Sequence, residues 1–178
     1  LHAVAVVNSG VFAVTRLTWY AFGPNLLSGS AVQTFCVLLS SFSMVFAAVM
    51  ALKERHFKRR LAYSTMSNLS YILFGVSLMT ERGLAGALSH MLFHGVMKIS
   101  LFFVAGILNV KADRFYVSEL SGLGRAMPLT FGAFTLASLG LIGIPPFNGF
   151  YSKYAIASAA AAEGSLPALL GIAALLIS

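Results

Sequence analysis

The sequence predicts an all-α fold: a polytopic bundle of transmembrane helices in which one helix is discontinuous. Three observations support this prediction. Of the 178 residues, 58% are hydrophobic and only 10% are charged, whereas soluble domains are about half apolar and a quarter charged. Apolar runs recur along the whole chain, and a helix needs about 20 such residues to cross a bilayer. Near the C-terminal end, a short helical stretch lies between breaks rich in proline and glycine.

The length allows about six crossings, at roughly 20 residues and a loop each. The chain begins and ends inside apolar runs, so we expect a fragment of a longer membrane protein, with residues 1–178 forming a single transmembrane domain. The single cysteine, Cys36, excludes an internal disulfide and a cluster held by several cysteines of this chain. The expected helical segments are 1–22, 31–52, 61–79, 84–110, 128–143, 149–162 and 167–178.

The first expected segment, 1–22, is mostly apolar but carries Asn8 midway and Trp19 and Tyr20 near its end. Aromatic residues at that position fit an interfacial belt. An asparagine at membrane depth is expected to hydrogen-bond across a helix contact. Gly23 and the proline after it then break the helix.

The second expected segment, 31–52, carries no charged residue, and the loop 53–60 that follows it (KERHFKRR) holds five basic residues and one acidic residue. An excess of lysine and arginine in a short loop indicates the cytoplasmic side. The polar stretch 111–126 lies two crossings later and is also net basic. We therefore expect both loops on the cytoplasmic side.

The segment 84–110 carries ionisable residues at steps of four: His90, His94 and Lys98. Four residues advance a helix by about 400°, so the three side chains fall within an arc of about 80° and climb about 12 Å along one face. Ionisable groups inside a membrane almost always face protein or water. This row predicts a proton path; the alternative is a polar helix contact. The hydroxyl-rich face of 61–79 is expected to pack against it.

The segments 128–143 and 149–162 are separated by the sequence IPPFNG, which cannot continue a helix. At membrane depth, such a break is tolerated only where protein or water satisfies the free backbone groups. Discontinuous helices build ion sites in transporters, and Lys153 lies in the short second piece. The alternative is a lysine that extends its charge to the membrane interface.

Four motifs in this order resemble the antiporter-like, proton-translocating membrane subunits of respiratory complex I, multisubunit cation/proton antiporters and energy-converting hydrogenases. The motifs are LHAVAVVNSGVF, FKRRLAYSTMSNLSYILFG, GALSHMLFHGVMKISLFFVAGIL and MPLTFGAFTLASLGLIGIPPFNGFYSKY. The resemblance implies that the chain is part of a larger fold built on inverted repeats. It also implies a hydrophilic axis that passes protons through lysines and histidines inside the membrane.

The resemblance assigns a proton-path position to five residues of this chain. They are Lys58, with Arg59 beside it as an alternative, His90, His94, Lys98 and Lys153.

Two further positions depart from the family pattern, because Asn8 stands where many relatives carry lysine and Asn68 where many carry histidine. Neither amide can titrate. A relay near them would need water or a hydroxyl such as Ser9 or Ser67, so these residues are accessory candidates.

The expected function is proton translocation, or cation/proton antiport, by a membrane subunit of one of these complexes. Where water is scarce, a charged ammonium is disfavoured and its protonation depends on neighbouring charges. We expect no redox chemistry, no cofactor and no metal. The expected partners are other membrane subunits, protons, Na⁺ as an alternative ion, and the lipid bilayer of the cell membrane, without nucleic acid.

Two alternatives to this function remain open from the sequence. The first is a metal or haem site, because His90 and His94 have the i, i+4 spacing of such ligands. Against it, a catalytic zinc normally needs a third protein ligand, and residue 91 is methionine where the HExxH motif has glutamate. The second alternative is a bundle subunit with a purely structural role.

Overall fold

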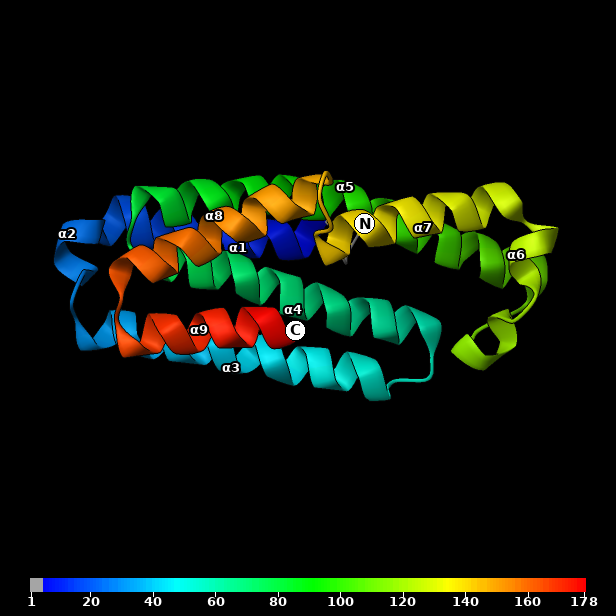
Figure 1. Cartoon of the computed structure of the whole chain (residues 1–178), viewed down its shortest axis with the longest axis horizontal. Helices are drawn as coiled ribbons and strands as arrows, with labels where there is room; N and C mark the ends of the chain where they lie inside the picture. The colour runs from blue at the N-terminus through cyan, green and yellow to red at the C-terminus, as the bar shows by residue number, and fades with distance from the viewer. Residues whose placement is uncertain (1–4) are drawn as a thin grey trace.

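The computed structural model describes residues 5–178, and its long helices run along the long axis of the molecule (Figure 1). The elements are α1 (Val7–Arg16), continued by the wider π-type turns of η2 (Leu17–Phe22), α2 (Pro24–Leu27), α3 (Ala31–Lys53), α4 (Phe57–Ser77), α5 (Glu81–Ala112), the 3-10 turn η3 (Val117–Leu120), α6 (Leu123–Ala126), α7 (Pro128–Ile142), α8 (Asn148–Glu163) and α9 (Leu166–Ile177). The predicted all-α bundle is confirmed. The first four residues of the expected segment 1–22 lie outside the described residues.

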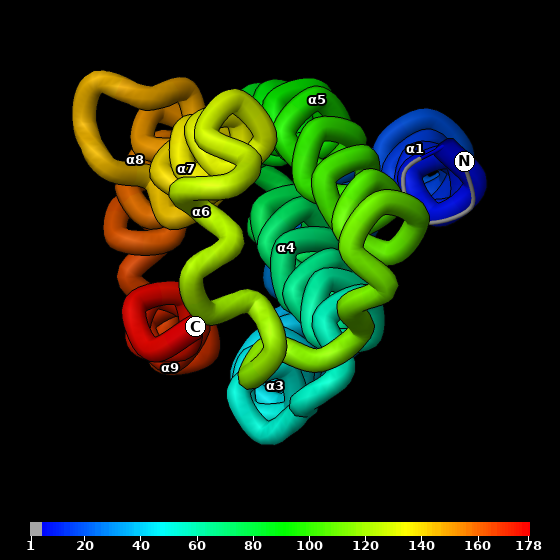
Figure 2. The backbone as a smooth tube through the Cα atoms, turned by 90° about the vertical axis from the view of Figure 1, so that its right-hand side faces the viewer, coloured from blue at the N-terminus to red at the C-terminus, as the bar shows by residue number. Residues whose placement is uncertain are grey.

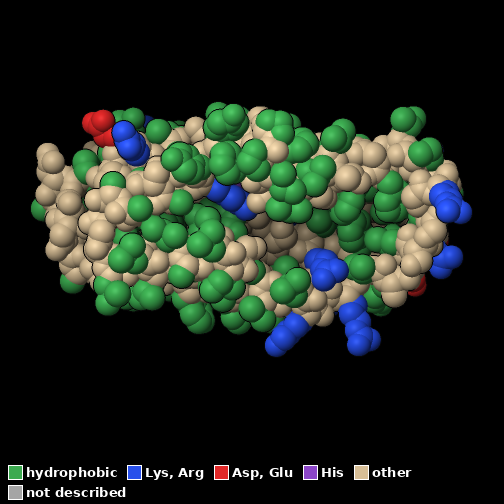
Figure 3. Space-filling view, viewed as in Figure 1, with side chains coloured by type: hydrophobic (Ala, Val, Ile, Leu, Met, Phe, Trp, Pro, Cys, Tyr) green, Lys and Arg blue, Asp and Glu red, His purple; other side chains and the backbone are tan. Residues whose placement is uncertain are grey.

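The surface of the bundle is apolar, as lipid contact requires. Hydrophobic side chains are spread along the whole length of the face seen in Figure 3. On α5, Leu92, Val96 and Phe103 are each about 70% exposed, whereas Lys98 on the opposite side of the same helix is fully buried. Helices α3, with 23 residues, and α5, with 32, are each long and apolar enough to cross a bilayer.

Helix α4 lies at the centre of the bundle, as the end-on view shows (Figure 2). It packs against α3 on one side and α5 on the other, and α8 closes over α5. Helix α9 packs against α3 and α8. Two of the three helices that carry the proton-path candidates, α4 and α5, therefore meet in the interior, with the third, α8, against them.

Helix α5 begins and ends outside the expected range 84–110, for reasons visible at its caps. The Thr80 hydroxyl accepts a hydrogen bond from the amide of Gly83 at 3.1 Å, so the helix starts at Glu81. It continues to Ala112 and stops where Asp113 adopts a left-handed conformation, with φ of 50°.

The two basic loops lie at the same end of the bundle because their backbones are joined. The amide of Phe57 donates to the carbonyl of Phe115 at 2.9 Å, and the amide of Val117 donates to that of Arg55 at 3.0 Å. This pairing starts α4 at Phe57, so the second half of the expected loop 53–60 is helical. Lysine and arginine side chains gather toward this end (Figure 3).

The discontinuity between α7 and α8 occurs at the predicted IPPFNG sequence. Gly143 ends α7 with a φ of +88°, a conformation that glycine adopts without strain. The peptide bond between Pro145 and Pro146 is cis, and α8 starts at Asn148. The break leaves the carbonyl of Ile142 free to accept from a side chain.

Candidate functional site

The ionisable side chains of α5 form a buried row on the inner face of that helix. His90, His94 and Lys98 each have an exposed fraction of 0%. The rings of His90 and His94 lie almost parallel, with their centroids 6.2 Å apart. The spacing of four residues therefore places all three groups inside the bundle, as the sequence predicts.

His90 joins α5 to two neighbouring helices. Its Nε2 lies 3.2 Å from Oδ1 of Asn68 on α4, and its Nδ1 lies 2.9 Å from Oγ of Ser152 on α8. The edge of the Tyr71 ring also packs against it, with centroids 5.6 Å apart. The expected packing of the polar faces of 61–79 and 84–110 is confirmed by these contacts.

Lys98 is held by a backbone carbonyl of α4. Its Nζ donates to the carbonyl oxygen of Leu61 at 3.0 Å, and the hydroxyl of Thr65 donates to the same oxygen at 3.0 Å. The carbonyl oxygen of Leu61 is neutral, so the ammonium is hydrogen-bonded but its charge is not neutralised.

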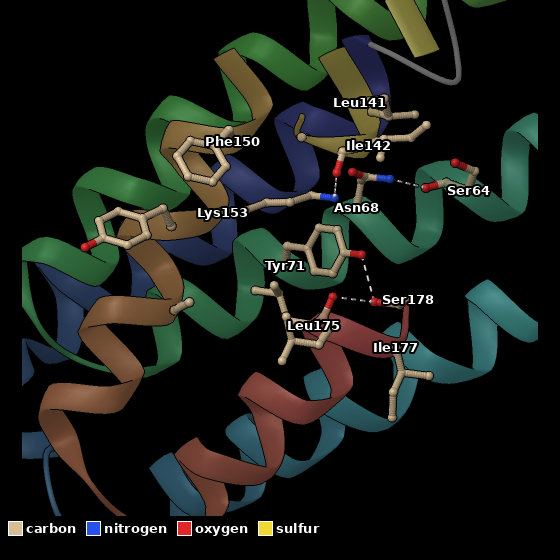
Figure 4. A pocket seen from close by; sticks show the side chains of 14 residues that line it. Ser64, Asn68, Tyr71, Leu141, Ile142, Phe150, Lys153, Leu175, Ile177 and Ser178 are labelled. Atoms are coloured by element: carbon tan, nitrogen blue, oxygen red, sulfur yellow. Dashed lines mark hydrogen bonds between the residues drawn. The ribbon is translucent and has the colours of Figure 1, made fainter. Parts of the chain in front are cut away.

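Lys153 approaches the row from the broken helix. Its Nζ donates to the carbonyl of Ile142, freed by the break, at 3.1 Å, and lies 4.9 Å from the centre of the Tyr71 ring. The side chain reaches into a cavity of about 620 Å³ between α4, the α7–α8 break and α9 (Figure 4). Asn68, the partner of His90, lines the same cavity.

Lys58 lies outside the buried row. It is half-buried in the first turn of α4, and Asn109, near the end of α5, accepts from its Nζ at 2.6 Å when the amide is oriented to satisfy both of its groups. Its neighbour Arg59 is exposed.

A set of apolar residues, here called the apolar layer, packs together where the start of α4, beside Lys58, meets the part of α5 between Lys98 and Asn109. It is made of Phe57, Leu61, Leu101, Val104, Ala105 and Leu108, with α7 packed against it. The layer therefore separates Lys58 from the three residues of the row.

The accessory candidates occupy other positions. Ser67 donates to the carbonyl of Met44 on α3 at 3.1 Å, and Ser9 donates within its own helix to Val6 at 2.7 Å. The Oδ1 of Asn8 is buried and accepts no hydrogen bond from residues 5–178. The expected cross-helix partner for this oxygen is thus absent, because α1 packs on α4 through apolar side chains.

The hydroxyl that contacts the row is Ser152, which sequence reasoning did not single out. It precedes Lys153 in the chain and is 1% exposed. No local motif marks it, because its contact with His90 spans 62 residues. Only the register between α5 and α8 could have indicated the contact.

The metal-site alternative finds no support in the geometry. Across residues 5–178, no three side chains of histidine, cysteine, aspartate or glutamate gather in a group that could hold a metal ion. The two rings stack face to face, and both nitrogens of His90 already have hydrogen-bond partners.

Fold and site together define an integral membrane helix bundle in which a buried lysine and two buried histidines lie beside a broken helix that carries a partly buried lysine. Residues 1–178 match the family described as NADH:quinone oxidoreductase/Mrp antiporter, TM. The chain belongs to this family.

The relatives show how much of a family member the chain represents. It is 35% identical to NADH-quinone oxidoreductase subunit L of Mycobacterium tuberculosis, over 99% of this chain and 27% of that protein. It superposes on the Mrp complex from Dietzia sp. DQ12-45-1b with a TM-score of 0.86 and 28% identity, over 96% of this chain and 31% of the other. It superposes on respiratory complex I from Thermus thermophilus with a TM-score of 0.82 and 25% identity, over 94% of this chain and 35% of the other. The chain thus spans about a third or less of the length of these relatives.

Proposed function

We propose that this chain is part of a proton-translocating membrane subunit and that protons move along its lysines and histidines. The observation that carries the proposal is the buried row on α5, together with Lys153 on the broken helix. The hydrogen-bond acceptors of Lys98 and Lys153 are both neutral backbone carbonyls. A buried ammonium without a carboxylate partner is costly, which favours a group that gains and loses its proton over a permanent charge.

The spacing of the row provides the coupling. Two protonated rings whose centroids are 6.2 Å apart, such as His90 and His94, repel by about 2.7 kcal/mol at an effective dielectric constant of about 20. That energy corresponds to about a hundredfold lower chance of finding both charged. A proton that arrives at one residue of the row therefore promotes release of the proton held by the next residue. A change of charge at Lys153 or Lys98 then drives protons along the row.

Lys58 is the proposed exchange point with the aqueous phase, with Arg59 as the alternative. Lys58 lies at the end that carries the basic loops, on the far side of the apolar layer. We propose that this end, with loops 53–60 and 111–126, is cytoplasmic, because both loops are net basic and their backbones are paired.

The setting of the chain follows from its family and its surface. We propose that residues 1–178 form one transmembrane domain of a multi-pass subunit in the cell membrane, where other membrane subunits and lipid cover its apolar exterior. The relatives belong to NADH-quinone oxidoreductase and to an Mrp complex. The transported ion is H⁺ alone or H⁺ exchanged for Na⁺; proton uptake measured with and without a Na⁺ gradient distinguishes these two modes. No step of the path requires a cofactor.

The test replaces the two lysines Lys98 and Lys153, one at a time, in the complete complex. Lys98→Ala and Lys153→Ala should each reduce proton uptake into vesicles by at least about tenfold, while native gels show normal assembly. Lys111→Ala is the matched control, because that lysine is exposed at the end of α5. If Lys98→Ala and Lys153→Ala both assemble and transport at the rate of the control, the row is structural and the proposal is wrong.

A further inference from the structure

The hydroxyl of Ser152 has two acceptors within reach and only one hydrogen to donate. Its Oγ lies 2.9 Å from Nδ1 of His90 and 3.2 Å from the carbonyl oxygen of Gly149, one turn earlier in α8. The side chain is 1% exposed. Because a serine hydroxyl carries a single hydrogen, it serves one of these acceptors at a time.

The hydrogen bonds on the other side of His90 fix which nitrogen carries the hydrogen of the neutral ring. The amide nitrogen of Asn68 donates to the carbonyl of Ser64 at 2.8 Å, so its Oδ1 faces His90. An amide oxygen only accepts, and Nε2 of His90 must therefore be the donor. In the neutral ring, Nδ1 is left as an acceptor for the hydroxyl of Ser152.

We propose that Ser152 is a two-position proton relay for His90, an inference that rests on the proposed function. With His90 neutral, Oγ–H donates to Nδ1. During uptake, Oγ receives a transported proton as it passes its own hydrogen to Nδ1. An N–H bond forms, one O–H bond breaks and another forms, and the ring gains one positive charge. The new hydroxyl hydrogen then turns to the Gly149 carbonyl, and Nδ1–H donates to Oγ.

This arrangement keeps His90 hydrogen-bonded in both protonation states. Nε2 donates to Asn68 throughout, and Nδ1 changes from acceptor to donor without losing its partner. A buried polar atom that loses its partner is strongly destabilised. The Ser152 hydroxyl removes that penalty from the charged state, so His90 can gain a proton inside the bundle.

Proton exchange at His90 is assigned to the α8 side of the ring. The Asn68 amide oxygen does not take up protons, which excludes Nε2 as the exchange point while that contact holds. Ser152 borders a mostly apolar hollow of about 260 Å³ between α5 and α8, whose lining also includes the hydroxyl groups of Ser89 and Tyr151. The proton therefore reaches or leaves His90 through Oγ.

The transport test compares two serines of α8. Ser158 is the matched control, because its hydroxyl donates only to the carbonyl of Ala155 in its own helix, at 2.9 Å. In the complete complex, Ser152→Ala should reduce proton uptake about tenfold or more, and Ser158→Ala should leave it unchanged. Ser152→Thr, which keeps the hydroxyl and has the hollow for its methyl group, should restore most of the rate.

A second readout follows the hydrogen bond itself and does not depend on transport. In the complex labelled with ¹⁵N-histidine, wild-type His90 should show hydrogen on Nε2, and its Nδ1 signal should move in Ser152→Ala but not in Ser158→Ala. Hydrogen on Nδ1 of the neutral ring, or an unmoved signal, overturns the relay.

The two proposals fail in distinguishable ways. If Ser152→Ala transports normally while Lys98→Ala does not, the relay is wrong and the proposed function stands. If Ser152→Ala, Lys98→Ala and Lys153→Ala all transport normally, the proposed function is wrong and the relay falls with it.

Discussion

Replacing Gly86 by alanine is predicted to separate α5 from α8 without changing any ionisable group. Gly86 lies four residues before His90, and the α8 residues beside it lie three and four residues after Ser152. A Cβ at Gly86 would be 3.1 Å from Cβ of Ala155, 3.0 Å from Cγ1 of Ile156 and 3.1 Å from its backbone nitrogen. The backbone atom and the alanine carbon cannot turn away, so the helices themselves must move.

The size of this movement sets the expected effect. Carbon atoms in ordinary contact are about 3.5–4.0 Å apart, so α8 must shift by about 0.4–0.9 Å from the two atoms at 3.1 Å. The same shift lengthens the contact of 2.9 Å between His90 and Ser152 to about 3.3–3.8 Å, beyond a good hydrogen bond. Hydrogen bonds to charged groups contribute about 1.5–3 kcal/mol, which corresponds to a loss of about tenfold to a hundredfold in proton transfer.

The assay is proton uptake into vesicles that carry the complete complex, with assembly checked on native gels. Gly106→Ala is the matched control, because Gly106 lies on the same helix and an added Cβ meets no atom within 4 Å. The control should transport at the wild-type rate. Normal uptake by Gly86→Ala, with an unchanged Nδ1 signal of His90, would refute the link between helix spacing and proton transfer.

Three further predictions concern other parts of the chain. A cysteine placed in loop 53–60 should resist an impermeant thiol reagent in intact cells, whereas one in the turn 79–83 should react; the reverse pattern would invert the topology. Lys98→Arg should transport protons as poorly as Lys98→Ala, because arginine does not release its proton. Lys153→Glu should retain partial proton uptake, because a carboxylic acid can also carry a proton. Equal rates in Lys98→Arg and Lys153→Glu would contradict these roles. Hydrogen bonds from the backbone amides of Phe115 and Tyr116 lower the pKa of Glu119 below 4.5. The stabilising effect of Glu119 on that turn is therefore complete at neutral pH and is lost as the pH falls through the lowered value; hydrogen exchange of the two amides, compared with Glu119→Gln, measures this loss.

The sequence was sufficient for the features that depend on local pattern. Steps of four residues placed His90, His94 and Lys98 on one helix face, and the structure buries all three. The prolines after Gly143 located the helix break. These predictions succeed because helical periodicity and proline chemistry act within a few residues.

The remaining features depend on how distant segments meet. Ser152 contacts His90 only through the register of α8 against α5, and Lys58 finds Asn109 only because α4 and α5 run side by side. The start of α4 at Phe57 is fixed by a carbonyl 58 residues further along the chain. A local pattern carries no information about such contacts.

The apolar layer between Lys98 and Lys58 has an electrical consequence. Across a membrane potential of 100 mV, each elementary charge that crosses dissipates about 2.3 kcal/mol. An unbroken conductor would let protons run down that potential continuously, as a short circuit does. In the proposed path, the apolar side chains of this layer would act as an insulator in series with the row. Current would then flow only when the layer is briefly wetted or displaced, so a membrane that contains this subunit would stay charged between transport events.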